Sequence, residues 1–254
     1  MNAPEPLVAF AQTAGLVLAR VASMFISAPA FSQQQIPMEV RAGISLAMTA
    51  ILLSTVPPLP HSLPIPSLVF GVIVQCAIGF LQGLVFAAVL AAAVAAGDLL
   101  DISVGYAFAS SVDPTGDTGA HATLSRLLQY VATLAFLAVG GHLWIVSGMI
   151  KSLHAAPVST TTLPVVLVEA AVRQIADVLR EGFHLCLPVV AFMLLIDLVG
   201  AMVSKSVPQL QIMSISFPIK VLGGVLALAW FSPTIVQMVS EALYRFYQML
   251  AGGG

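Results

Sequence analysis

Charged side chains are scarce in this sequence: aspartate, glutamate, lysine and arginine together make up 8% of its 254 residues. A soluble domain carries about a quarter of such residues. The net charge of −2 at pH 7 and the lack of any basic cluster exclude an electrostatic surface for nucleic acid. Because 59% of the residues are hydrophobic and the mean hydropathy is +1.02, the composition is that of a membrane protein.

Cysteine is also rare, and the familiar catalytic motifs are missing. Cys76 and Cys186 each lie within an apolar run, which is typical of small buried side chains and not of a disulfide or a metal site. The sequence has no Gly-x-Ser-x-Gly elbow, no phosphate-binding glycine loop and no His-Glu-x-x-His motif. Its five histidines show no metal-ligand spacing. We therefore expect no enzymatic activity, no cofactor and no metal.

The sequence is instead rich in long apolar segments, which predict an all-α fold. The first segment follows Glu5, has no basic residue at its start and contains Arg20, so we expect an uncleaved helix and not a secretion signal. The expected helical segments are residues 7–31, 42–56, 67–96, 127–150, 165–181, 183–203 and 212–230, with a last amphipathic helix that starts at Ser232-Pro233.

Prolines, glycines and alanines predict how these segments are joined and packed. The proline-rich stretch from Pro57 to Pro66 predicts an extended linker, because proline cannot continue a helix. The stretch from Ser111 to Ser125 is rich in glycine and polar residues and predicts a loop. Small residues recur at four-residue spacing within 67–96 and predict a face against which another helix packs closely. These are Gly79, Gly83, Ala87, Ala91 and Ala95.

Five charged residues lie within or beside the apolar segments: Arg20, Asp98, Asp101, Asp197 and Lys220. A charge at the centre of a bilayer costs about 2.5–3.5 kcal/mol on insertion scales, so such groups face a partner or water. A proton-coupled transporter with the aspartates as carriers is one explanation. An intramembrane aspartyl protease that uses Asp98 and Asp101 is a weaker one, because two carboxylates on one helical turn do not flank a substrate. We favour a structural explanation, in which the charges pair across helices or protein covers them.

Taken in chain order, several short stretches resemble one family over essentially the whole sequence. They are Arg20, Ser27–Phe31, Ile36–Arg41, Ala96–Phe108, Val112–Pro114, Gly141–Leu143, Ser152–Pro157, Leu187–Val190, Asp197–Gly200, Val207–Leu210 and Phe217–Lys220. The order of these pieces, more than any one of them, is similar to that in the FliR proteins of the flagellar type III export gate, whose injectisome relatives are called SctT.

The resemblance implies an all-α, integral membrane-type protein of long, kinked hairpin helices. Residues 1–254 would form a single membrane domain, in which a FliP-like portion is joined to a FliQ-like hairpin at 183–251. The implied function is structural and not enzymatic: one copy would assemble with FliP- and FliQ-like subunits around a pore for unfolded export substrates. FlhB-like and FlhA-like export proteins are further implied partners. The implied location is the inner membrane, in the flagellar basal body, with a part raised toward the periplasm.

The resemblance also implies roles for individual residues. Residues 106–125 correspond to the family's plug, with Tyr106, Phe108, Asp113, Pro114, Gly116 and Gly119 as its expected positions. The charges Arg20, Asp98, Asp101, Asp197 and Lys220 are expected to act in assembly or as buried charges. Helix breaks or turns are expected at Pro29, Pro37, Pro188, Pro208, Gln209 and Pro218. Two alternatives stay open, an injectisome SctT homologue and a proton-coupled transporter that uses Asp98, Asp101 and Asp197.

Overall fold

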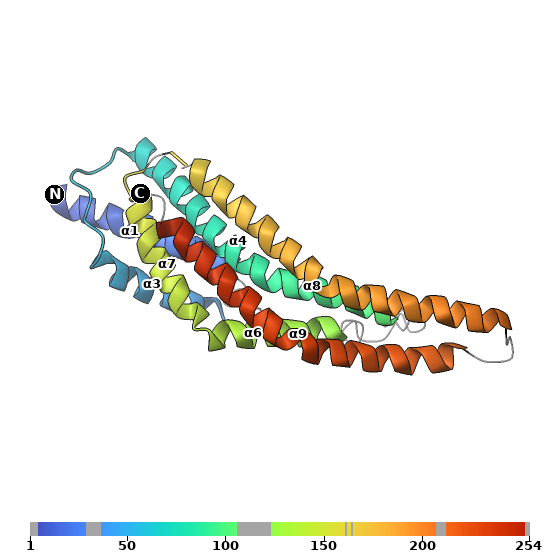
Figure 1. The fold of residues 1–254 in the computed structure, drawn as a ribbon. Coiled ribbons are helices and arrows are strands. Elements are labelled where there is room, and N and C mark those ends of the chain that lie inside the picture. Colours follow the sequence, from blue (N-terminus) through green and yellow to red (C-terminus); the bar gives the residue numbers. More distant parts are fainter. Residues whose placement is uncertain are drawn as a thin grey trace. The chain divides into compact units, whose positions relative to one another are not determined.

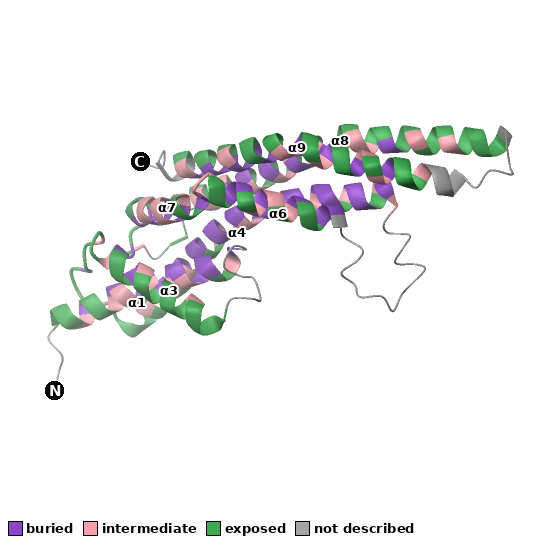
Figure 2. Cartoon of the chain, turned by 90° about the horizontal axis from the view of Figure 1, so that it is seen from below, coloured by how far each residue is buried: buried purple, intermediate pink, exposed green. Residues whose placement is uncertain are grey.

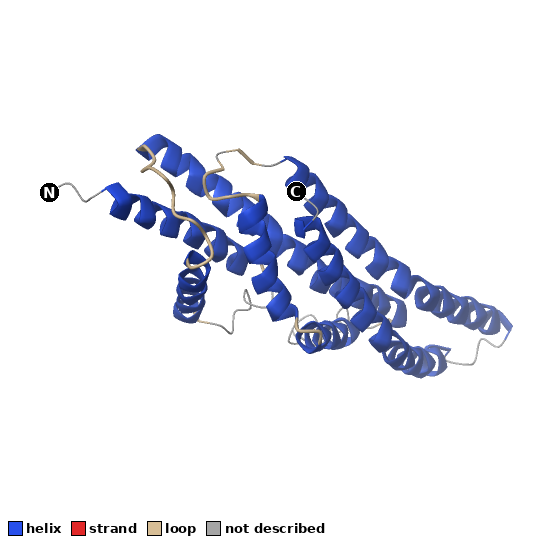
Figure 3. Ribbon diagram, turned by 60° about the vertical axis from the view of Figure 1, so that its left-hand side comes forward, coloured by secondary structure: helices blue, strands red, loops and turns tan. Residues whose placement is uncertain are grey.

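The computed structural model describes residues 5–28, 37–105, 123–160, 162–163, 165–206 and 212–251. Within these ranges all regular secondary structure is α-helical, which confirms the expected fold class (Figure 3). Figure 1 shows the helices in chain order. They are α1 (Glu5–Ser27), α3 (Met38–Leu53), α4 (Ile65–Val104), α6 (Thr123–Ala138), α7 (Gly141–Ala155), α8 (Val165–Ser206) and α9 (Ile212–Ala251).

Among the described residues, four helices are long and apolar enough to cross a membrane: α1, α4, and most of α8 and of α9. They differ in how much of their apolar surface the chain itself covers. The most apolar window of α4 is 61% buried, whereas that of α8 is only 11% buried (Figure 2). Large side chains of α8 such as Leu194 and Met202 are more than half exposed. An apolar surface of this extent calls for lipid or another protein chain.

The chain divides into two compact units. The first unit contains Met1–Ala88, Gly140–Ala176 and Ala242–Gly254, and the second contains Val89–Val139 and Asp177–Glu241. Three helices, α4, α8 and α9, contribute one part to each unit. We describe each unit by itself.

In the first unit, α1 packs closely on the early part of α4 through two glycines. A Cβ atom on Gly79 would collide with the main-chain carbonyl of Arg20, and one on Gly83 would lie 2.6 Å from the carbonyl oxygen of Met24. The Ser27 hydroxyl donates a hydrogen bond to the Phe80 carbonyl oxygen across the same contact, at 3.1 Å. The predicted small-residue face is therefore confirmed at Gly79 and Gly83.

The same prediction is wrong further along α4, where Ala91 is exposed. The physical reason is the helical repeat: residues four apart are rotated by about 40° relative to one another, because 3.6 residues make one turn. Over several steps such a row leaves the face on which it began. In the second unit, α4 instead presents Ala92 to α8, where a Cβ on Gly182 would lie 2.9 Å from the Ala92 Cβ.

The proline-rich linker between α3 and α4 lies outside any helix from Pro57 to Pro64, as predicted, but the prediction is wrong at Pro66, which lies in the first turn of α4. Hydrogen bonds hold the linker to α1. The side-chain amide of Gln12 both donates to the Leu63 carbonyl oxygen (3.0 Å) and accepts from the Leu63 N–H (2.7 Å). The Thr13 hydroxyl accepts from the N–H of Leu59 at 3.0 Å. These bonds satisfy main-chain groups that neither a helix nor a sheet provides for.

Several predicted helix boundaries are wrong. The expected single segment 127–150 is two helices. They are separated at Gly140, whose positive φ of +76° cannot continue a right-handed α-helix. The segments 165–181 and 183–203 are one helix, α8, which continues through Pro188. Likewise α9 continues through Pro218 and Pro233, so no new helix starts at Ser232-Pro233. Neighbouring turns can keep an apolar helix intact around a proline that lacks its own N–H.

The packing of α1 on α4 makes a prediction about glycine. Gly79→Ala should lower the thermal stability of the detergent-solubilised protein by about 2 kcal/mol, because a backbone carbonyl cannot move aside for the new methyl group. Gly15→Ala is the matched control, since nothing lies within 4 Å of a Cβ at that position. In the control the better helix propensity of alanine should leave stability equal or raised. Equal melting curves for both variants would contradict the close approach.

Candidate functional site

Arg20 of α1 is fully buried in the first unit and holds the C-terminal end of α7. Its Nη1 donates to the carbonyl oxygen (3.0 Å) and the hydroxyl (3.1 Å) of Ser152, and its Nη2 donates to the carbonyl oxygen of Ala156 (2.7 Å). Its Nε donates to Oε1 of Gln75 on α4 at 2.6 Å. Within the described part of the chain, every recorded partner of Arg20 is a neutral group.

These contacts belong to a wider polar network that we call the Arg20 cluster: Arg20, Gln75, Gln82, Ser152 and Ala156. The Gln75 amide also donates to the carbonyl oxygen of Val158 at 3.4 Å, and the Gln82 amide donates to the Ser152 hydroxyl. Gln82 Oε1 is buried and has no hydrogen-bond partner among the described residues. The cluster therefore joins α1, α4 and α7 through hydrogen bonds in an otherwise apolar interior.

In the second unit, Asp101 of α4 binds the N-terminal end of α6. It is buried, and its two carboxylate oxygens accept the main-chain N–H groups of Leu124 and Ser125, each at 3.0 Å. Both N–H groups lie in the first turn of α6, where no intrahelical acceptor exists. The Ser125 hydroxyl donates back to the Val94 carbonyl oxygen at 3.2 Å, and a Cβ on Gly97 would collide with Ser125. Asp101 thus caps α6 from a neighbouring helix.

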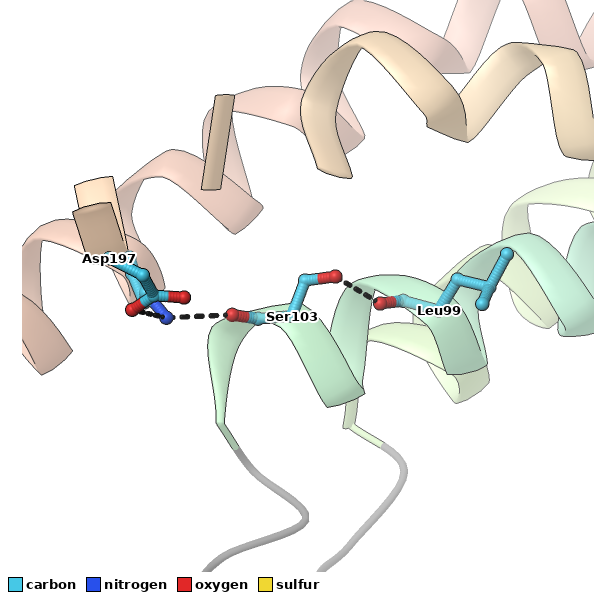
Figure 4. Close-up of polar contacts among 4 residues, drawn as sticks. Leu99, Ser103 and Asp197 are labelled. Atoms are coloured by element: carbon cyan, nitrogen blue, oxygen red, sulfur yellow. Dashed lines mark hydrogen bonds and ion pairs between the residues drawn. The ribbon is translucent and has the colours of Figure 1, made fainter. Parts of the chain in front are cut away.

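Lys220 of α9 holds the C-terminal end of α4 in the same unit. Its Nζ donates to the Ser103 carbonyl oxygen at 3.0 Å and forms an ion pair with an Asp197 oxygen of α8 at 2.5 Å (Figure 4). The Lys220 side chain is 11% exposed, whereas that of Asp197 is 52% exposed. Close to this contact, a Cβ on Gly224 would lie about 3 Å from side chains of both Val104 and Leu124. The ion pair therefore joins α8 and α9 to the end of α4.

The three buried charges share one physical role. Each lies at the end of a helix other than its own, and its sign matches that end: the cations Arg20 and Lys220 lie at helix C-termini, and the anion Asp101 lies at a helix N-terminus. Helix ends carry unpaired main-chain groups and a partial charge, so a side chain of opposite sign stabilises them. This arrangement can fasten helices together. Each of the three charged groups has hydrogen-bond partners, and Lys220 also has an oppositely charged one.

The other residues that the sequence singled out fall into four groups. Asp98 is exposed on α4, one turn before Asp101. Pro37 is the N-cap residue of α3, whereas Pro188 and Pro218 lie inside α8 and α9. Of the expected plug, residues 123–125 form the first turn of α6. Outside the described residues lie Tyr106, Phe108, Asp113, Pro114, Gly116, Gly119, Pro29, Pro208 and Gln209.

Sequence reasoning missed the neutral partners of the charges. Gln75, Gln82 and Ser152 are all buried, yet each is an ordinary polar residue in an apolar run. A signal existed for the glutamines: two buried amides on one long apolar helix, seven residues apart, lie on one face and call for partners. The carbonyl acceptors are main-chain atoms that every residue has, so no sequence pattern marks them. In the described residues, no group of three or more potential metal ligands occurs.

Comparison with known proteins adds independent information about the whole chain. Residues 11–246 match the family described as bacterial export proteins, family 1. The chain is similar to the flagellar biosynthetic protein FliR of Pectobacterium carotovorum, with 30% identity over 91% of this chain and 88% of that protein. It is 29% identical to the FliR protein of Caulobacter vibrioides over 91% of this chain and 92% of that protein. For the FliR protein of Escherichia coli K12 the identity is 26%, over 92% and 89% respectively.

The geometry of the Arg20 cluster predicts that the planar shape of the guanidinium group contributes to stability in addition to its positive charge. Arg20→Ala should destabilise the solubilised protein by about 3 kcal/mol or more, because it leaves several buried acceptors unpaired. Arg20→Lys keeps the charge but lacks the planar fork that reaches Gln75 and Ala156 together, so it should recover only part of the loss. Arg126→Ala, an exposed arginine on α6, is the control. Melting curves would contradict the cluster if Arg20→Ala behaved like this control.

The cap on α6 predicts a local effect. Asp101→Asn should weaken the first turn of α6 by about 1 kcal/mol, since one of the two acceptor oxygens becomes a donor that faces an N–H. Hydrogen exchange followed by mass spectrometry should then show about fivefold faster exchange in peptides that begin near Leu124. Asp98→Asn, on the same helix but exposed, should leave this exchange unchanged. Equal exchange in the two variants would rule out the cap.

Proposed function

Because this chain belongs to the FliR family of bacterial export proteins, we propose that it serves as a structural subunit of the flagellar protein export apparatus. It is a membrane-embedded component, with several helices apolar and long enough to span. In finer detail, we infer one copy per gate, assembled with FliP- and FliQ-like subunits around a pore for unfolded export substrates. FlhB-like and FlhA-like proteins would be its further neighbours, and part of the assembly would be raised toward the periplasm.

The observation that supports this proposal is that the buried charged side chains bind the ends of other helices. Arg20, Asp101 and Lys220 each hold the end of another helix, and Asp197 pairs with Lys220. A proton-coupled transporter would need carboxylates that exchange protons along a shared path. Here Asp98 is exposed, Asp101 accepts two N–H groups and Asp197 is in an ion pair. These contacts favour the structural subunit over the transporter, and they give no support to a protease.

The exposed apolar surface supports assembly with other chains. Along α8 and α9, side chains such as Phe192, Leu198, Leu222 and Trp230 are more than half exposed. A partner subunit or lipid must cover them, because soluble proteins rarely expose contiguous apolar patches of more than a few hundred Å². Asp197 lies among these residues, so a covering chain would also meet its carboxylate. This surface is what the proposed FliQ-like hairpin, residues 183–251, would present to sister subunits.

We also propose that residues 106–125 act as the plug of the pore. The support from the described residues is limited to the two ends of this segment. Asp101 holds Leu124 and Ser125, its last two residues, and Lys220 holds the Ser103 carbonyl shortly before its start. Firm attachment of both ends is what a segment that must close a pore requires. The likeness to proteins named for flagellar biosynthesis favours the flagellum over an injectisome as the system served.

Secretion of flagellar proteins by the chain's own bacterium tests this function. Deletion of the gene should abolish secretion of flagellar substrates and motility, and the wild-type gene should restore both. Lys220→Met should restore little, because it removes the ion pair and the contact to Ser103 together, worth about 2 kcal/mol. Asp197→Asn, which keeps the Ser103 contact, should restore more. Lys205→Met, on an exposed lysine at the end of α8, should restore secretion fully.

A charge exchange separates the two contacts of Lys220. Asp197→Lys combined with Lys220→Asp keeps opposite charges but turns a carboxylate toward the Ser103 carbonyl. If the contact with the end of α4 matters, the double variant should secrete no better than Lys220→Met. Full secretion by the double variant would show that the ion pair alone suffices. Normal secretion and motility in the deletion strain would overturn the proposed function.

A further inference from the structure

Within the first unit, α7 lies beside the C-terminal end of α9 (Figure 1). Two aromatic rings and one cation meet there. The Nζ of Lys151 lies 3.4 Å from the ring centroid of Tyr247. The indole of Trp144 meets the same ring edge-on, with centroids 5.1 Å apart and an interplanar angle of 89°. Trp144 and Lys151 are seven residues apart on α7, two turns along one face. All three side chains are partly exposed.

The polar atoms of this cluster are all donors or can donate, and the described residues supply no acceptor for them. Among the described residues, the ring of Tyr247 is the only recorded partner of the Lys151 ammonium group. No hydrogen bond is recorded there for the Trp144 indole N–H or for the Tyr247 hydroxyl. A lysine over an aromatic face keeps its remaining N–H groups free to bind an acceptor. The surface therefore offers a cation and two further donors to an acceptor from outside the chain.

The position of the cluster indicates where that acceptor comes from. Tyr247 lies at the end of the candidate membrane span Ser216–Gln248. Exposed apolar side chains adjoin the cluster in sequence, with Leu143 next to Trp144 and Tyr244 one turn before Tyr247. Tryptophan and tyrosine gather where a span leaves the hydrocarbon, and lysine there extends toward the headgroups. An anionic acceptor at that depth is a lipid phosphate.

We propose that Trp144, Lys151 and Tyr247 form a binding site for the headgroup of an anionic phospholipid, which anchors this part of the chain at the membrane interface. The phosphate oxygens accept from the Lys151 ammonium group, with the indole N–H and the tyrosine hydroxyl as further donors. The acyl chains lie along the apolar residues beside the cluster. This inference goes beyond the export function and does not depend on it.

Fluorescence of Trp144 tests the site directly, because the chain has only two tryptophans. Trp230→Phe leaves Trp144 as the only tryptophan of this chain, and the same preparation with Trp144→Phe gives the signal of accompanying subunits to subtract. The full-length protein, purified in mild detergent with any subunits that accompany it, is titrated with brominated phosphatidylglycerol or brominated phosphatidylcholine, each of which quenches tryptophan on contact. Phosphatidylglycerol should quench at a mole fraction about fivefold lower, as expected for one lysine near an anionic headgroup. Free inorganic phosphate should not displace it.

Lys151→Gln in the same background should abolish the preference for phosphatidylglycerol, and Lys205→Gln should leave it unchanged. Equal quenching by the two lipids before mutation would overturn the site. Protection of Trp144 from both lipids would also overturn it, and would assign the surface to a protein partner. Because the readout is lipid selectivity, a loss of secretion with intact selectivity would count against the export function alone.

Discussion

Helix ends are the places in this protein where main-chain groups need partners most, and charged side chains from other helices provide them. Water is scarce around apolar helices, so the unpaired carbonyl and N–H groups of each terminus must find acceptors or donors within the protein. Arg20 meets the end of α7, Lys220 meets the end of α4 and Asp101 meets the start of α6. In each case the sign of the charge opposes the partial charge of the helix end.

This constraint explains why a chain with so few charges keeps some of them inside apolar segments. Removing such a charge would leave an unsatisfied helix end, and adding one elsewhere would leave an unsatisfied charge. The same requirement distinguishes the buried charged residues from the exposed ones. Asp98, which holds no helix end in the described structure, is exposed, whereas Asp101 one turn later is buried. Glycines such as Gly79 and Gly97 bring the backbones close enough for these contacts.

The sequence predicted the helical class, the linker as far as Pro64 and the identity of the unusual charges, because each has a local signal. It did not predict the partners of the charges, since these are distant carbonyl and N–H groups: Arg20 and Ala156 are 136 residues apart. The predicted helix boundaries were wrong where a residue type that often marks the end or start of a helix lies inside one. Pro233 suggested a helix start but lies inside α9, and the pattern change near Gly182 suggested a break where a small residue lets α8 approach α4. The four-residue spacing on α4 failed because it drifts off one helix face.

We propose that this chain is one subunit of a larger export gate, whose other subunits cover the apolar surfaces of α8 and α9. The most direct measurement is the native mass of the tagged protein in mild detergent, with and without coexpressed FliP- and FliQ-like proteins from the same organism. One copy of this chain in a larger hetero-oligomer is expected when the partners are present. A stable monomer or homodimer that ignores those partners would contradict it.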